Sequence, residues 1–321
     1  MLAAHLEWNY DEPSEFSSWS VSLLWVLVHA VSKTTTLKGT RRQAESPAEI
    51  LIYVLDTKAI AENRIYRSKD LVRTFDLNHI DFIEDYCQGE YLVHGRLQHT
   101  DGFKAVTLAE LIFAGLYVRY PGLRLDTGKY KVHVRSRRLR GEYSDQIWSL
   151  RSRVTPNYRF LGRCFGQEWE AVMTLAFISV RARDTDTKAS RAILLEDLDG
   201  LPIPRGMLAA GSAVIDPTRP DDGIHEADQL AEWLSLLRKR RLRHQKRKQQ
   251  KAEDDKDVAD MLSGLTCDPQ IRASLRVAIA LANAYGRAAS EAQFTNRGLT
   301  HDDRDTGPVY DLVSVVWAGP A

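Results

Sequence analysis

Hydrophobic and polar positions change their spacing along the chain, and each change predicts a different element. The apolar run WSVSLLWVLVHAV, residues 19–31, has the length of a helix. Trp25 and His29 lie four positions apart in that run, so we expect them on one helical face. The β-branched run ILIYVL, residues 50–55, is shorter and is followed by Asp-Thr, which is typical of a buried strand.

Similar short runs continue to about residue 120. They predict strands in 14–18, 64–66, 90–97 and 103–108, and helices in 69–75 and 108–117. The order is strand, helix, strand, strand, helix, strand, strand, helix, which indicates an α+β fold. Since neighbouring strand residues point to opposite faces, we expect unequal burial of the apolar strand residues Ile52, Val54, Leu92 and Val93.

The regular pattern weakens after residue 120, and we predict four parts. Residues 1–125 form a globular α+β domain and 126–160 form a basic linker. Residues 161–227 hold a helix plus an irregular segment, and 228–321 hold a basic helix and a C-terminal helix. The C-terminal region is therefore expected to be mostly helical.

Charge is balanced over the whole chain and concentrated locally. The 44 Lys and Arg residues nearly cancel the 43 Asp and Glu residues, so an argument for nucleic acid must rest on a cluster. Residues 238–251, RKRRLRHQKRKQQK, are such a cluster, with nine Lys or Arg among fourteen positions. The cluster is consistent with a solvated helix, a nuclear-localisation segment or a nucleic-acid contact, although it lacks aromatic residues for base stacking.

Several classes of protein are disfavoured by the remaining composition. The three cysteines are widely separated, which predicts neither a disulfide framework nor a metal site and points to a reducing compartment. The longest apolar run has 13 residues and about 20 are needed to span a bilayer, so we expect no membrane insertion. Acidic residues precede that run, which argues against a signal peptide. We therefore predict an intracellular protein, nuclear or cytoplasmic.

The first 120 residues contain segments that resemble a known family. The segments SEFSSW, IYVLDT and GEYLVHGRL occur in that order, at 14–19, 52–57 and 89–97. This series resembles a family of uncharacterised fungal proteins that share a domain of unknown function. The resemblance does not extend beyond the first 120 residues and by itself implies no activity.

The same order is also similar to the catalytic half of enterotoxin-type ADP-ribosyltransferases. Those folds have a serine-containing strand, a strand of the type IYVxxT, and a strand that opens with Gln-x-Glu. The counterparts here are Ser17 and Ser18, the strand at 52–57, and Gln88 and Glu90. The resemblance implies catalytic roles for Glu90 and Gln88 and a cofactor-binding role for Ser17 and Ser18, with NAD as the cofactor.

The chemistry implied by this resemblance is NAD cleavage. Positive charge develops on the ribose as its bond to nicotinamide breaks, and the Glu90 carboxylate would stabilise that charge. Gln88, two residues earlier in an extended chain, would lie on the same side and orient an acceptor. Ser17 would support Glu90 by a hydrogen bond from the neighbouring strand.

One part of the family pattern is missing. The first strand of such folds supplies an Arg or His that grips the dinucleotide, but here only residues 1–13 precede the serine strand. His5 is the sole candidate, and it lies in a predicted short helix. We therefore expect the ADP-ribosyltransferase-like domain to be N-terminally incomplete or degenerate.

Three function classes follow from these observations. The first is a non-catalytic interaction protein with an unknown protein partner and no cofactor. The second is an active NAD-dependent ADP-ribosyltransferase or NAD glycohydrolase that uses Glu90. The third is a nucleic-acid-associated protein that acts through residues 238–251.

Overall fold

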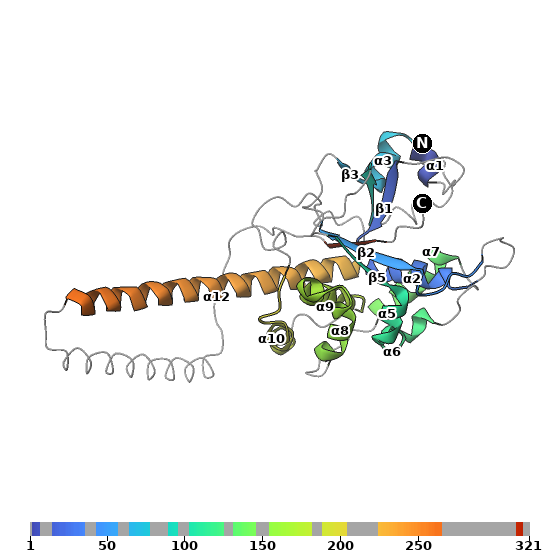
Figure 1. Ribbon diagram of the computed structural model, residues 1–321. Coiled ribbons are helices and arrows are strands. Elements are labelled where there is room, and N and C mark those ends of the chain that lie inside the picture. The colour runs from blue at the N-terminus through green and yellow to red at the C-terminus, as the bar shows by residue number, and fades with distance from the viewer. Residues whose placement is uncertain are drawn as a thin grey trace. The chain divides into compact units, whose positions relative to one another are not determined.

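Figure 1 shows the fold of the 321-residue chain in a computed structural model. The structure describes residues 2–6, 15–35, 43–56, 64–77, 89–95, 103–124, 131–145, 154–181, 188–203, 224–264 and 313–316. It has two compact units, one of residues 1–238 with 309–321 and the other of residues 239–308. The helix predicted after residue 269 lies outside the described residues.

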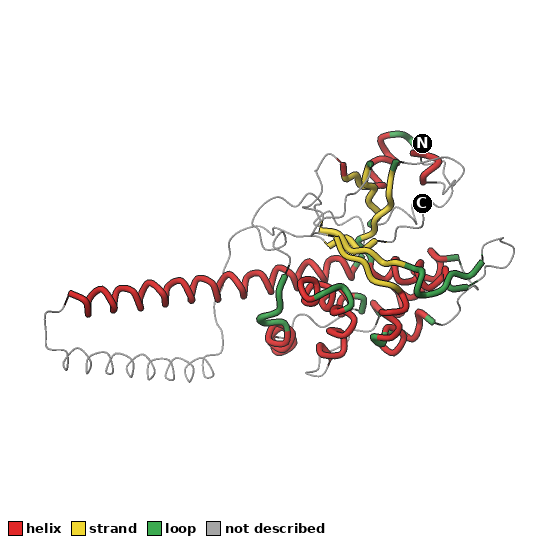
Figure 2. Tube along the Cα trace, viewed as in Figure 1, coloured by secondary structure: helices red, strands yellow, loops and turns green. Residues whose placement is uncertain are grey.

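Six strands of the first unit form an antiparallel sheet (Figure 2). The strands are β1 Phe16–Ser20, β2 Leu51–Asp56, β3 Ile65–Arg67, β4 Glu90–His94, β5 Phe103–Thr107 and β6 Val313–Val316. Their order is β3-β4-β1-β6-β2-β5, and every pair is antiparallel. The sheet therefore has two small parts, β3-β4-β1 and β2-β5, which β6 joins from the far end of the sequence.

The element order predicted for residues 14–120 is confirmed. Helices α2 Leu23–Lys33, α3 Ser68–Thr74 and α5 Leu108–Phe113 take the predicted places among these strands, and α1 Leu2–Leu6 precedes β1. The structure is thus mixed α and β, with a helical part after the strands. Thr107 and Glu110 form a capping box at the start of α5, which satisfies backbone N–H groups that no helical bond would reach.

The apolar run at 19–31 is divided between two elements. Its first residues complete β1, which ends at Ser20, and α2 begins only at Leu23. Ser22 is the reason for this boundary, because its hydroxyl accepts a hydrogen bond from the Trp25 N–H at 3.1 Å and caps the helix. Nearly every residue of α2 is buried, which confirms a core helix.

The later helices are α6 Leu116–Arg119, α7 Val132–Ser144, α8 Val154–Arg163, α9 Glu170–Ser179, α10 Lys188–Asp197 and α12 His225–Gly264. Helix α7 lies inside the predicted basic linker, and α10 lies inside the predicted irregular segment. In α7 the buried positions Arg135, Leu139 and Tyr143 share one helical face. The Arg135 guanidinium donates a hydrogen bond to the Leu123 carbonyl, which allows a basic residue to occupy a core position. The buried face of α7 is therefore not apolar throughout, and the sequence pattern did not indicate a helix there.

The largest hydrophobic core does not end at residue 125. It joins α2, β2 and β5 to α5, α7, α8, α9 and the start of α12. Trp169 and Trp233 are fully buried in it. The predicted apolar stripe of the long helix is confirmed, since Leu230, Trp233, Leu234 and Leu237 are all buried.

Both faces of the sheet are covered, which makes the expectation of unequal strand burial wrong. Ile52, Val54, Leu92 and Val93 are all 2% exposed or less. Leu92 packs on one face against Leu6 and Val72, while Val93 packs on the other face in a separate apolar cluster. Alternation still sets the direction of each side chain, but each direction leads to a buried environment.

No described helix combines the length and the hydrophobicity that crossing a bilayer requires. Within the described ranges, no three His, Cys, Asp or Glu side chains gather in a way that could hold a metal ion.

Candidate functional site

Glu90 is the first residue of β4, and the antiparallel register places it opposite Ser20 of β1. Ser18 lies opposite Leu92 in the same ladder. Residues directly opposite and residues two apart share a face of the sheet, so Ser18, Ser20 and Glu90 point to the same side. This brings together two of the four residues predicted for the site.

The Ser18 hydroxyl links Glu90 to the N-terminal helix. It hydrogen-bonds to the Glu90 carboxyl group and lies 3.0 Å from Nε2 of His5 in α1. Burial lowers the pKa of His5, which favours the neutral imidazole. His5, the one predicted candidate for holding a dinucleotide, is therefore committed to a hydrogen bond within the domain.

Burial raises the pKa of Glu90 to about 7, although hydrogen bonding to Ser18 and Ser68 opposes the rise. The Ser68 hydroxyl is buried and makes no well-formed hydrogen bond, so Ser18 is the stronger of these two partners. A carboxyl group with this pKa is partly protonated at neutral pH. It can donate or accept a proton, as a general acid or base must.

The space beside Glu90 is small. A cavity of about 40 Å³ is lined by Ser18, Trp19, Ser20, Trp25, Val26, His29 and Glu90. Trp25 and His29 reach it from one face of α2, which confirms their predicted placement. A water molecule needs roughly 10–15 Å³, whereas ligand pockets usually measure about 300–1,000 Å³. The cavity has room for water but not for a dinucleotide.

Ser17 does not contact Glu90, which corrects the predicted support from this residue. As the neighbour of Ser18 in β1, it points to the opposite face of the sheet. Its hydroxyl accepts a hydrogen bond from Trp19 Nε1 at 2.8 Å and donates to the Val93 carbonyl at 3.4 Å. Ser18 makes the contact with Glu90 that the sequence analysis assigned to Ser17.

Gln88 lies outside the described residues, but the residue after it bears on the prediction. Gly89 has a φ of +64°, a left-handed conformation that favours glycine. A Cβ at this position would also collide with the Ile224 side chain and lie 2.7 Å from Val21 Cγ2. The chain is therefore not extended at Gly89, and the role of Gln88 stays a prediction.

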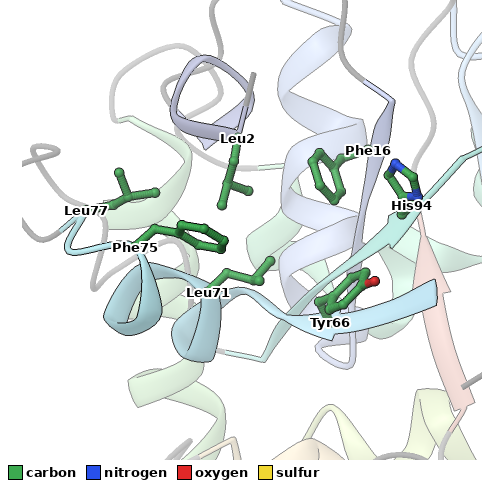
Figure 3. Close-up of a pocket in the computed structure, with 7 residues that line it drawn as sticks. All are labelled: Leu2, Phe16, Tyr66, Leu71, Phe75, Leu77 and His94. Carbon is green, nitrogen blue, oxygen red and sulfur yellow. The ribbon is translucent and has the colours of Figure 1, made fainter. Parts of the chain in front are cut away.

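A second, larger cavity lies on the same face of the sheet, and the sequence analysis missed it. It measures about 520 Å³ and is lined by Leu2, Phe16, Tyr66, Leu71, Phe75, Leu77 and His94. Figure 3 shows these side chains around one shared space between α1, α3 and the strands. Five of these residues come from five different elements, Phe75 and Leu77 follow α3, and the seven have no common sequence spacing. The one local signal is Phe75, an aromatic residue at the end of α3 that is 60% exposed.

The basic segment at 238–251 belongs to α12. Its side chains are half-buried as far as Arg241 and exposed from Leu242 onward, except that Lys239 is also exposed. The segment is thus helical, as predicted, and most of its charge faces solvent.

Residues 1–101 match a protein family described as Domain of unknown function (DUF7587). The match includes His5, Ser18 and Glu90 and all the residues that line the larger cavity. No curated protein and no solved structure matches the chain.

Proposed function

We propose that the DUF7587 domain is a degenerate, non-catalytic relative of the ADP-ribosyltransferase-like folds and acts as an interaction module in the nucleus or cytosol. One observation carries the proposal: the cavity beside Glu90 measures about 40 Å³. NAD must lie against that carboxylate for the charge on its ribose to be stabilised. With room only for water there, Glu90 has lost access to the substrate that the resemblance implies.

Two further features support this proposal. His5 is held by Ser18 at 3.0 Å in a helix, rather than offered from a strand to a phosphate group. Gly89, the residue before β4, has a φ of +64° and is not extended, whereas the family motif is expected to be part of a strand. Catalysis depends on substrate held within about 1 Å of its reacting position, so these departures should each lower activity greatly.

The test is release of nicotinamide from NAD by the purified full-length chain. We expect no release above the buffer blank, from the wild type or from Glu90→Gln. Hydrolysis by water needs no acceptor protein, so a missing acceptor cannot explain a negative result. Glu253→Gln, at an exposed position of α12, is the matched control. Turnover by the wild type that disappears in Glu90→Gln and persists in Glu253→Gln would overturn the proposal.

That opposite result would favour the second candidate, an NAD-dependent ADP-ribosyltransferase or NAD glycohydrolase. The observation in its favour is the Glu90 pKa of about 7, because carboxyl groups with such values are frequent in active sites. Buried structural carboxyl groups have raised pKa values for the same physical reason. The small volume of the cavity is therefore the stronger argument, and it favours a non-catalytic Glu90.

A third candidate is an association with nucleic acid through the basic segment at 238–251. The exposure of its charge beyond Arg241 favours this function or nuclear import. Phosphate contacts release bound counterions, so binding to duplex DNA should weaken steeply with salt and should also weaken when Lys246, Arg247 and Lys248 are changed to Gln. Nuclear import is tested by comparing the nuclear signal of a fluorescent fusion of this variant with that of the wild-type fusion, and we expect a lower signal for the variant. Unchanged DNA binding and unchanged nuclear signal would remove both roles.

A further inference from the structure

We propose that the larger cavity of the DUF7587 domain is a binding site for a neutral, planar aromatic small molecule that carries a polar group at one end. This inference does not depend on whether Glu90 is catalytic, because the larger cavity and the smaller cavity beside Glu90 have no lining residue in common. The volume of about 520 Å³ falls within the range of about 300–1,000 Å³ that is usual for ligand pockets.

The walls of the cavity favour a flat ring system. Four of its seven lining residues are aromatic, namely Phe16, Tyr66, Phe75 and His94. The rings of Phe16 and His94 are 5.3 Å apart at an interplanar angle of 54°, in the tilted arrangement that aromatic pairs prefer. A planar ligand can stack on or meet the edges of such rings, which adds to the gain from burying its apolar surface.

The polar atoms of the cavity are gathered at one end. In Figure 3 the Tyr66 hydroxyl lies beside His94, while Leu77 and Phe75 are at the other end. Nε2 of His94 is 2.9 Å from Oε2 of Glu15. A ligand would therefore place its apolar rings between Leu2, Leu71 and Phe75 and its polar group towards His94.

The charges at this end favour a neutral polar group. The Glu15 carboxylate disfavours an anionic group, and Arg64, whose Nε donates to the His94 carbonyl at 2.9 Å, disfavours a cationic one. A hydroxyl group can both donate and accept hydrogen bonds and suits this mixed environment. A fatty acid fits less well, because its carboxylate would face Glu15 and its chain has no ring.

Two of the aromatic residues that line the cavity are partly exposed to solvent. Phe75 is 60% exposed and Tyr66 is 36% exposed, although both are large and partly apolar. A ligand that covered them would remove apolar surface from water. We therefore expect binding that saturates as the ligand concentration rises.

The test uses 1-hydroxypyrene, a planar, neutral and fluorescent probe, titrated into the full-length chain. We expect saturable binding with one site per chain. Phe75→Ala should weaken binding at least fivefold because it removes one wall. Phe113→Ala is the matched control, since Phe113 is 96% exposed on α5 and does not line the cavity. Leu71→Trp should weaken binding because its larger side chain occupies part of the cavity, with circular dichroism and thermal melting to confirm a folded chain.

A second comparison tests the polar end. Tyr66→Phe should weaken 1-hydroxypyrene several-fold and leave unsubstituted pyrene unchanged. Equal binding by Phe75→Ala and Phe113→Ala, undiminished binding by a folded Leu71→Trp, or no binding by the wild type would each overturn the site. Tighter binding of dodecanoate than of 1-hydroxypyrene would overturn the ligand class.

Discussion

The two cavities within residues 1–101 lie on one face of the same strand pair, yet they differ in size and character. Along the β1–β4 ladder, Phe16 is opposite His94 at the larger cavity, and Ser20 is opposite Glu90 at the smaller one. Ser18 and Leu92 lie between them. One cavity measures about 520 Å³ with mainly apolar walls, whereas the other measures about 40 Å³ and is lined in part by the half-buried Glu90. The difference in volume is the reason that we place the proposed binding site at the larger cavity and not beside Glu90.

The largest effect should come from Leu92, which separates the two cavities and is fully buried. Leu92→Ala would remove side-chain packing against Leu6 and Val72 and leave a void. We expect a loss of about 2–5 kcal/mol in the free energy of unfolding, measured with denaturant. The control Leu242→Ala, at a position 45% exposed in α12, should cost less than about 0.5 kcal/mol. Equal effects would show that Leu92 does not support this face of the sheet.

The next largest effect is a pH dependence of the protein's stability, which arises from Glu90 in the smaller cavity. The pKa of Glu90 is raised from 4.5 to about 7 in the folded protein, so the folded state holds this proton more tightly than the unfolded chain. Its stabilising contribution is complete below about pH 4.5 and is lost as pH rises to about 7. The loss amounts to up to roughly 3 kcal/mol, reduced by any access of solvent to the carboxyl group.

Denaturant unfolding of the wild type and Glu90→Gln at pH 5 and pH 8 measures this term. The free energy of unfolding of the wild type, relative to Glu90→Gln, should be lower at pH 8 than at pH 5. The control Glu253→Gln, on the exposed part of α12, should show no such change. A difference between wild type and Glu90→Gln that is the same at both pH values would contradict a buried, proton-binding Glu90.

The smallest effect distinguishes the two serines. Ser18 hydrogen-bonds to Glu90 and lowers its pKa, whereas Ser17 faces the other side of the sheet. Ser18→Ala should therefore raise the Glu90 pKa further, by up to about one unit, and Ser17→Ala should leave it unchanged. Carbon-detected NMR of the glutamate carboxyl groups measures both. A rise of equal size in Ser17→Ala would show that the register of β1 and β4 is different.

The sequence by itself determined the order of elements over residues 14–120 and the buried stripe of α12. These features depend on local spacing, since a helix repeats every 3.6 residues and a strand every two. The shared face of Trp25 and His29 was predictable for the same reason. The sequence also predicted Glu90 as the central residue of the candidate site, from a resemblance, but whether it has any catalytic role stays a prediction.

Other features depended on contacts between distant segments. Ser18 rather than Ser17 reaches Glu90 because the pairing of β1 with β4 puts Ser18 on the same face of the sheet as Glu90. A shift of this pairing by one residue would put Ser17 there instead. Arg135 is a core residue because the Leu123 carbonyl meets its guanidinium, which no periodicity indicates.

The volumes of the two cavities were also decided only in three dimensions. Residues of α1, α3 and three strands line the larger cavity. In the smaller cavity, side chains of α2 occupy part of the space beside Glu90. Local spacing sets the direction of a side chain, but the room left beside it depends on which remote elements pack there.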